Sequence, residues 1–338
     1  MAPVLPLRRV RRLLATARRR RVLVVGDAML DQFLWGRVNR ISPEAPVPVV
    51  EFDHESFMPG GAANVARNLS ALGVRTELVA SVGEDAAAAT LRRLLEAEGV
   101  ECRGLVPQGQ RPTSIKTRVI ANRQQLVRVD REARGDLEGP ASEALWRRVR
   151  SRLPEVDGVV VGDYGKGVVT QGLLDRVRGE CRRRGIWLSL DPKPVHRLDL
   201  SGMSLLTPNR KEMFELAGVA ESAPLVEPLG EATLQGVAAR LLEELRPALL
   251  LVTLGEHGML LCQRGQAAVH IPTRAREVFD VSGAGDTVIA VFTLAIVAGA
   301  SPVEAAELSN HAAGVVVGKL GTAVVTPEEL LASFEKVG

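Results

Sequence analysis

The chain has 338 residues, of which 46% are hydrophobic and 25% charged, and its formal net charge is +3 at pH 7. This length and composition can bury a sizeable core, and the longest apolar run, around residues 288–300, is too short to cross a membrane. Three separated cysteines form neither a disulfide framework nor a zinc-ligand spacing, so we expect free thiols in a reducing cytoplasm. These features argue against a disulfide-rich secreted domain and against a membrane span.

The first 21 residues carry the basic excess of the chain. They contain eight arginines and no acidic residue, so the rest of the chain is net acidic. Val10, Leu13, Leu14 and Ala17 recur at helical spacing and predict an amphipathic helix that packs on the following domain. A contact with nucleic acid or an anionic membrane is the less favoured interpretation, and a transit peptide is weaker still.

Short apolar runs alternate with helical segments along most of the chain. Strands alternating with helices at this spacing predict an α/β fold, a three-layer α/β/α sandwich with a mostly parallel central sheet. Most runs end in glycine or polar residues, and that edge of an open α/β sheet is where ligands bind. The predicted strands lie within 21–27, 76–83, 156–167, 185–193, 203–209 and 248–258, and the clearest helices within 84–98, 171–184 and 233–246.

Two regions interrupt this alternation and predict a small β lid. Segment 38–56 is proline-rich with short extended pieces, and segment 114–130 alternates like a β-hairpin. An isolated hairpin is marginally stable in water, so we expect the lid to pair with the lid of a second copy in a homodimer. The expected boundaries are 1–21 for the basic segment, 22–338 for the domain, and about 33–57 and 105–131 for the lid.

Two features beside the ligand edge of the sheet suit a small polar ligand. In PGGAANVARNLSALG, Gly60 and Gly61 permit an unusual turn or close approach, and Asn64 offers an amide in the first helical turn. A helix with a glycine-rich start also arises for structural reasons alone. The carboxylates of Asp27 and Asp31 suit neighbouring sugar hydroxyls, but either residue can equally cap a turn.

The stretch FDVSGAGDTVIAVFTLAIVAGA joins a glycine-rich turn, an acid and an apolar helix. An N-terminal cap before a core helix explains Asp286 but not the glycines. Backbone N–H groups of Gly283, Ala284 and Gly285 at a helix N-terminus suit an oxyanion or a transferring phosphoryl group. Asp286 is then placed to take a proton from a hydroxyl that attacks the phosphorus. The chain has no GxxxxGK[ST] and no GxGxxG after the first strand, which argues against a P-loop enzyme and a dinucleotide dehydrogenase.

Both glycine-rich stretches resemble the two signatures of the ribokinase/PfkB family of carbohydrate kinases. The matching segments are GGAANVARNLSALGVRTELVASVG (60–83) and DVSGAGDTVIA (280–290), in the order found in the family. The resemblance runs from about residue 21 to the C-terminus. It implies a ribokinase-like fold with a β lid, and ATP with Mg²⁺ as the phosphoryl donor. It leaves a requirement for a monovalent cation open.

Longer motifs resemble one branch of that family, the D-glycero-β-D-manno-heptose-7-phosphate kinases. This likeness implies phosphorylation of the anomeric hydroxyl of the heptose 7-phosphate to the 1,7-bisphosphate, on the route to ADP-heptose and the lipopolysaccharide core. Many such kinases are fused to a C-terminal adenylyltransferase; no HxGH motif is present here, so the sequence favours the stand-alone kinase. The motifs are VVGDAMLDQFLWGRVNRISPEAPVPVV (24–50), NRQQLVRVD, DYGKG, TPNRKE, DVSGAGDTV and AAGVVVGKLGTAVVTPEEL.

The same resemblance assigns roles to individual residues. Asp286 matches the catalytic base, and Gly283 to Gly285 match the anion hole. Asn209 and Glu212 match an NxxE element that organises Mg²⁺, through water at Glu212, and the nucleotide phosphates; a plain capped helix is the structural alternative. The positions matching nucleotide contacts are Thr253, Gly255, Glu256 and Asn310. The positions matching sugar contacts are Asp27, Asp31, Gly60, Gly61 and Asn64. The candidate cations for the phosphate of the substrate are Lys116, Arg118, Arg123, Arg128 and Lys166, of which Lys116, Arg118 and Lys166 are preferred.

Two alternative functions stay open at this point. One is a sibling kinase for another sugar or nucleoside, such as fructose 1-phosphate or ribose, against which the RISPEAPVPVV motif speaks. The other is a catalytically silent sugar or nucleotide sensor whose arginine-rich N-terminus contacts nucleic acid. An intact Asp286 and an intact NxxE element argue against it.

Overall fold

A nine-stranded sheet forms the centre of the computed structural model, which describes residues 5–122, 124–221, 227–275 and 277–335. Seven strands pair in parallel, and β12 and β13 join the sheet through two antiparallel pairings, so the expected mostly parallel sheet is confirmed. In sheet order the strands are β13 (Val269–Ile271), β12 (Met259–Cys262), β11 (Leu249–Thr253), β10 (Leu205–Leu206), β9 (Trp187–Asp191), β8 (Gly158–Gly162), β1 (Arg21–Gly26), β4 (Arg75–Gly83) and β5 (Glu101–Gln108).

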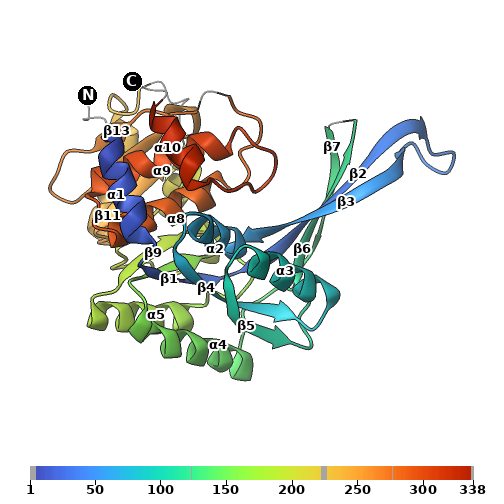
Figure 1. Cartoon of the computed structure of the whole chain (residues 1–338), viewed down its shortest axis with the longest axis horizontal. Coiled ribbons are helices and arrows are strands. Elements are labelled where there is room, and N and C mark those ends of the chain that lie inside the picture. Colours follow the sequence, from blue (N-terminus) through green and yellow to red (C-terminus); the bar gives the residue numbers. More distant parts are fainter. Residues whose placement is uncertain (1–4, 123, 222–226, 276, 336–338) are drawn as a thin grey trace.

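Helices cover both faces of this sheet (Figure 1). Side chains alternate along a strand, so Val22 and Val24 of β1 enter one core and Leu23 and Val25 enter the other. The first core packs against α1 (Leu7–Ala17), α2 (Ala62–Ala71), α3 (Ala86–Ala97), α8 (Ala284–Val297), α9 (Pro302–Val316) and α10 (Pro327–Glu335). The second packs against α4 (Gly139–Arg152), α5 (Gln171–Arg184), α6 (Arg210–Leu216) and α7 (Ala232–Glu244).

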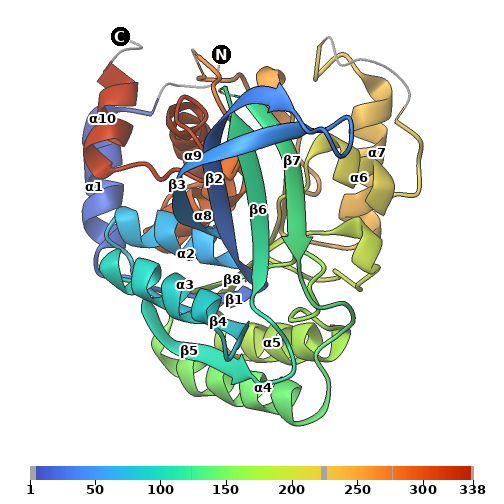
Figure 2. The same cartoon turned by 90° about the vertical axis from the view of Figure 1, so that its right-hand side faces the viewer.

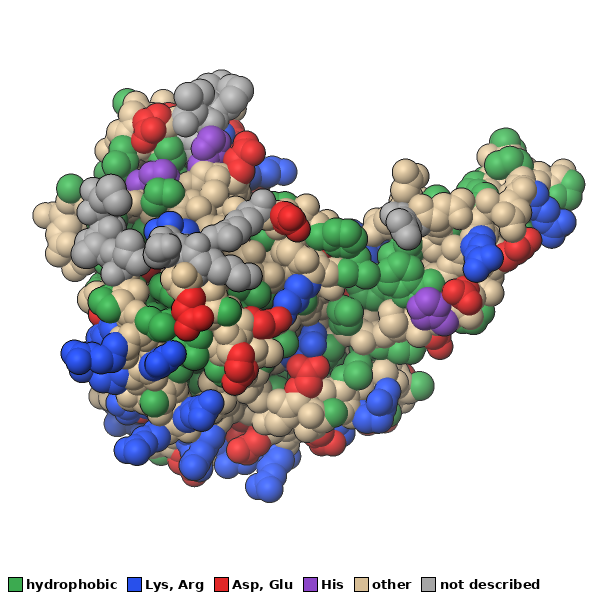
Figure 3. Space-filling view, turned by 45° about the horizontal axis from the view of Figure 1, so that its top comes forward, with side chains coloured by type: hydrophobic (Ala, Val, Ile, Leu, Met, Phe, Trp, Pro, Cys, Tyr) green, Lys and Arg blue, Asp and Glu red, His purple; other side chains and the backbone are tan. Residues whose placement is uncertain are grey.

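The lid is a separate four-stranded sheet that projects from the body in Figure 1 and faces the viewer in Figure 2. Its strands, in sheet order, are β3 (Pro48–Gly61), β2 (Ala28–Ile41), β6 (Ser114–Ala121) and β7 (Gln124–Arg131). The expected boundaries were partly wrong. Residues 105–108 belong to β5 of the main sheet, because Leu105 and Val106 are buried there and pair with β4. The lid strands also extend further toward the body than 33–57. An open hollow separates the lid from the body (Figure 3).

The basic N-terminal segment forms the predicted amphipathic helix, α1. Val10, Leu13, Leu14 and Ala17 are buried, and the helix lies against α10 and α8. Arg9 Nε pairs with Glu304 Oε1 over 2.7 Å and fixes the polar side of the helix to α9. The packed-helix interpretation is therefore confirmed. Among the described residues, no helix combines the length and apolar character needed to span a bilayer.

Candidate active site

Asp286 lies in the first turn of α8, buried at 8% exposure between two donors from other elements. Asn64 Nδ2 of α2 donates to its Oδ2 over 2.8 Å, and the Tyr164 hydroxyl donates to its Oδ1. Burial raises the pKa of the Asp286 carboxyl, and these two hydrogen bonds act in the opposite direction because they stabilise the carboxylate. The structure therefore holds a single carboxylate in a fixed orientation at a helix N-terminus.

The glycines before Asp286 have two different reasons to be glycine. Gly283 adopts the left-handed region, with φ 77°, and a Cβ there would lie 2.6 Å from the Asn64 amide nitrogen. At Gly285 a Cβ would meet no atom within 4 Å, so space inside the protein does not require glycine there. Gly285 lines a large cavity, as does Ala284. A bare backbone at this position lets a ligand approach closely.

The residues of the expected anion hole, Gly283 to Gly285, lie at the N-terminus of α8, and their role remains a prediction. The Ala284 N–H is already used, since it donates to the Val281 carbonyl over 3.2 Å. The following amides, of Gly285 and Asp286, belong to the first turn, where N–H groups have no partner within the helix. The macrodipole adds positive potential at the same place.

The cavity beside this helix start has a volume of about 730 Å³. It is mostly apolar and runs between β11, α8 and α9. Four of its lining residues are the predicted nucleotide contacts, and the described chain thus gathers them at one site as expected. They are Thr253, Gly255, Glu256 and Asn310.

Asn209 and Glu212 cap helix α6 near this cavity. Asn209 Oδ1 accepts from the Glu212 N–H over 2.9 Å, and Glu212 Oε2 accepts from the Asn209 N–H over 3.0 Å. These two hydrogen bonds form a complete capping box. The structural alternative for the NxxE element, a capped helix, is therefore present. Glu212 Oε1 also pairs with Lys193 Nζ over 3.1 Å. Both residues stay candidates for organising Mg²⁺.

Asp191, at the end of β9, is a residue that the sequence analysis missed. Burial raises the pKa of its carboxyl, and the neighbouring Glu212 and Asp286 carboxylates raise it further. The described residues hold no ready-made cluster of three metal ligands. Mg²⁺ in kinases is usually held by one or two carboxylates together with phosphates and water, and this donor set fits that pattern. The sequence feature that could have identified Asp191 is an acidic residue at the end of an apolar strand, as at Asp27.

The Asp27 carboxylate organises the loop after β8. It accepts hydrogen bonds from the backbone N–H groups of Tyr164, Lys166 and Val168, at 2.9 to 3.0 Å. Those bonds position Tyr164, the second residue that sequence reasoning missed, although its motif DYGKG was noted. The sugar contact expected at Asp27 remains a prediction.

Gly60 and Gly61 lie so close to neighbouring residues that a Cβ at either position would collide with them. Gly61 has φ 59°, and a Cβ there would come within 2.6 Å of the Asp27 carbonyl oxygen. A Cβ at Gly60 would collide with Asp31 Oδ2. The glycines thus serve packing around Asp27 and Asp31.

Arg118 of the lid forms a shielded ion pair with Asp31. Its Nη1 lies 2.5 Å from Asp31 Oδ1, and the guanidinium also stands over the Phe33 ring at 5.3 Å. Asp31, Lys116 and Asp130 are register partners across β2, β6 and β7, so their side chains share one lid face.

The remaining candidate cations lie near the same lid face. Lys116 is a direct register partner of Asp31, and Arg128 is the register partner of Arg118. Lys166 sits on the loop after β8, in contact with Glu132 at the end of the lid. Arg123 lies outside the described residues. The structure thus brings the preferred cations Lys116, Arg118 and Lys166 to the lid–body junction.

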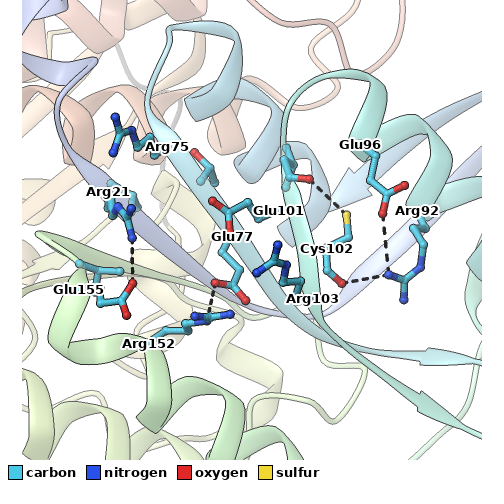
Figure 4. A pocket seen from close by; sticks show the side chains of 14 residues that line it. Arg21, Arg75, Glu77, Arg92, Glu96, Glu101, Cys102, Arg103, Arg152 and Glu155 are labelled. Carbon is cyan, nitrogen blue, oxygen red and sulfur yellow. Dashed lines mark hydrogen bonds and ion pairs between the residues drawn. The ribbon is translucent and has the colours of Figure 1, made fainter.

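A second hollow, of about 480 Å³, lies at the opposite edge of the sheet, where β1, β4 and β5 begin (Figure 4). It is rich in arginine, but its arginines are largely paired with carboxylates, so we do not assign the chemistry to it. The pairs are Arg21 with Glu155 and Arg152 with Glu77, both at 2.8 Å, and Arg92 with Glu96 at 3.9 Å.

Comparison with known families gives one extended match. Residues 19–329 match the model of the pfkB family carbohydrate kinases. Similar curated proteins include the bifunctional protein HldE of Citrifermentans bemidjiense, 46% identical over 92% of this chain, and that of Geobacter sulfurreducens, 44% identical over 92%. The chain spans 63% and 62% of the length of these two relatives.

Solved structures agree on the fold. Phosphofructokinase-2 from Escherichia coli superposes with a TM-score of 0.77 at 20% identity, covering 94% of this chain and 99% of that one. Arabidopsis thaliana ribokinase, solved with ribose and ATP, gives 0.72 at 19% identity with the same coverage. These likenesses show the ribokinase-like fold.

Proposed function

Because the chain belongs to the pfkB family of carbohydrate kinases, we propose that it phosphorylates the anomeric hydroxyl of D-glycero-β-D-manno-heptose 7-phosphate with ATP. The family makes it a sugar kinase, and the HldE relatives support the heptose phosphate as acceptor. One observation carries the mechanism. Asp286, the only acid in the first turn of α8, is buried at a helix N-terminus that borders the 730 Å³ cavity.

Asp286 acts as the general base in this proposal. Asn64 and Tyr164 hold its two oxygens, so a sugar hydroxyl that hydrogen-bonds to the carboxylate meets it in one orientation. The carboxylate takes the proton as the hydroxyl attacks the γ-phosphorus in line, while the bond from that phosphorus to the bridging oxygen of the β-phosphate breaks and ADP leaves. The amides at the start of α8 stabilise the negative charge on the transferring group.

The nucleotide occupies the cavity between β11, α8 and α9. Its apolar walls suit the adenine ring, with Asn310 and Thr253 among the lining residues. Mg²⁺, held by Glu212 and Asp191 together with phosphates and water, would neutralise charge on the phosphates. The lid closes over the sugar and excludes water, which would otherwise compete as acceptor.

The sugar lies between the lid and the body. Asp31 and Asn64 are the proposed hydroxyl contacts, with Asp27 behind them, and Gly60 and Gly61 leave room for the ring. Lys116, Arg118 and Lys166 are proposed to hold the 7-phosphate, because they meet at the lid–body junction.

We also propose a homodimer through the outer face of the lid. Val127 and Val129 of β7 lie on the face opposite Lys116 and Asp130, because side chains alternate along a strand. They are 49% and 55% exposed. An exposed apolar sheet face of this kind is covered when a second copy packs against it.

A panel of acceptors separates this proposal from its alternative, a kinase for another sugar or nucleoside. Coupled assays of ADP release would compare heptose 7-phosphate with ribose, fructose 1-phosphate and a nucleoside at equal concentration. The proposal predicts the highest kcat/KM for heptose 7-phosphate. A higher value for any of the others would assign the chain to a sibling kinase. The product would serve ADP-heptose and lipopolysaccharide core synthesis in the cytoplasm.

A further inference from the structure

Two lysines proposed to bind the phosphate share one carboxylate in this structure. Lys166 Nζ lies 2.6 Å from Oε2 of Glu132, and Lys116 Nζ lies 4.0 Å from the same atom. Glu132 directly follows β7 of the lid, whereas Lys166 belongs to the loop after β8 of the body. The carboxylate therefore connects the lid to the body through Lys166.

The Glu132 carboxylate is shielded from solvent but poorly satisfied. Its Oε2 atom is buried and makes no regular hydrogen bond to any of the described residues, so the two ammonium charges hold it. The Lys116, Lys166 and Glu132 side chains are only 18%, 19% and 25% exposed. Charges shielded in this way are screened less by salt than charges on an open surface. A group with more charge and more acceptor oxygens would fit between the lysines better.

Both lysines are fixed at their backbones independently of Glu132. The Lys166 N–H donates to Asp27 Oδ2 over 3.0 Å, and its carbonyl accepts from Arg111. Lys116 lies in the middle of the lid sheet, in register with β2 and β7. Lys116 Nζ donates a hydrogen bond to Asp130 Oδ2, at 3.1 Å. The lysines would stay in place if the Glu132 side chain turned away.

We propose that the Glu132 carboxylate occupies the phosphate position of the substrate in the free enzyme, and that the phosphorylated sugar displaces it. This inference rests on the proposed function. A phosphate carries nearly two negative charges near neutral pH and three acceptor oxygens, so it competes well for two ammonium groups. An uncharged sugar leaves Glu132 on the lysines. Glu132 therefore lowers the affinity for phosphorylated substrates and leaves the affinity for unphosphorylated ones unchanged.

Kinetics of Glu132→Gln test this role, because the substitution removes the competing charge and keeps the shape. KM for heptose 7-phosphate should fall about fivefold, the factor equivalent to a partly screened ion pair. KM for ATP and for unphosphorylated D-glycero-D-manno-heptose should not change. Glu51→Gln is the matched control, since Glu51 lies on the exposed part of the lid and contacts Asn39. An unchanged or raised KM for the phosphorylated sugar in Glu132→Gln would overturn the inference.

Binding of inorganic phosphate separates this inference from the identity of the sugar. If the wild-type enzyme does not turn over heptose 7-phosphate, the proposed substrate is wrong, but calorimetry with phosphate still tests Glu132. Glu132→Gln should then bind phosphate about fivefold more tightly than the wild type and Glu51→Gln, and adding Lys166→Met should remove the gain. Equal binding by the wild type and Glu132→Gln would overturn the displacement role.

A structure of the wild-type chain with phosphate bound gives a readout without any substitution. The inference predicts phosphate between Lys116 and Lys166 and Glu132 turned away from both. A structure in which phosphate is bound elsewhere, with Glu132 still on Lys166, would contradict it.

Discussion

The Asn64 amide donates a hydrogen bond to the Asp286 carboxylate across 2.8 Å, although the two residues are 222 positions apart in the chain. This contact joins the two glycine-rich segments into one site. It also explains Gly283, because a side chain there would strike the Asn64 amide. The helix starts of α2 and α8 therefore act as one unit around the base.

Replacing Asp286 by asparagine should remove the base and keep the shape of the side chain. We expect kcat to fall at least ~100-fold, the usual contribution of a positioned general base. KM for ATP should change little, since the nucleotide cavity is intact. Steady-state kinetics with both substrates measure this, and circular dichroism checks the fold. If kcat survived, the base would have to be another group.

Tyr164→Phe should shift the pH dependence of the reaction. The hydroxyl stabilises the ionised form of Asp286, so its removal raises the pKa of that carboxyl. Asp286 must be ionised to accept a proton, so the acid limb of the kcat/KM profile should move to higher pH. A profile with unchanged position, at equal thermal stability, would show that Tyr164 does not tune the base.

Glu212→Gln separates the capping role of this residue from its role in nucleotide binding. A glutamine at the third helical position still completes a capping box, so the melting temperature should stay close to that of the wild type. The Mg²⁺ concentration for half-maximal activity should rise, by about tenfold if one charge contact is lost. An unchanged Mg²⁺ dependence would restrict Glu212 to helix capping.

Burial of His311 should lower the free energy of unfolding of the protein in mild acid. It is 3% exposed, its ring stacks on Phe334, and burial lowers its pKa from 6.5 to about 4. Below pH 6.5 the unfolded chain binds a proton that the folded chain refuses until about pH 4, so the free energy of unfolding falls as the pH is lowered through this window.

The expected loss from His311 is about 2 kcal/mol between pH 7 and pH 5. Urea unfolding at both values measures it. His311→Gln, which can still contact Ser333, should lose this part of the pH dependence. If the free energy of unfolding depends on pH equally in the variant and the wild type, His311 does not cause the loss of stability.

A charge on the outer face of the lid should weaken the proposed dimer. Val129→Lys places an ammonium on the exposed apolar face, and desolvating it against a second copy is costly. We expect the dimer dissociation constant to rise at least ~10-fold in sedimentation equilibrium. A wild-type chain that stays monomeric at 100 times its assay concentration would refute the dimer.

The sequence alone was sufficient to predict the layered fold. Short apolar runs such as 21–26 and 249–253 predicted buried strands, and the spacing of Val10, Leu13, Leu14 and Ala17 predicted α1. The lid boundary was wrong because β5 and the lid strands have similar composition. Only burial against β4 separates them.

Several site residues could not be found from local patterns. Tyr164 reaches Asp286 through a loop that Asp27 shapes, and nothing in the local sequence of either residue records that contact. The Glu132 contact with Lys166 likewise depends on the position of the lid relative to the body. Such pairings are set by tertiary structure, whereas the glycine-rich turns and Asp286 are visible as short motifs.

The most direct test of the account is ³¹P NMR of the purified protein with Mg²⁺, ATP and D-glycero-D-manno-heptose 7-phosphate. We predict a new anomeric phosphate resonance beside an unchanged 7-phosphate signal, and no such resonance with Asp286→Asn on the same timescale. Phosphorylation at another position, or turnover only with ribose, fructose 1-phosphate or a nucleoside, would contradict the heptose assignment. An Asp286→Asn variant that keeps full activity would contradict the mechanism.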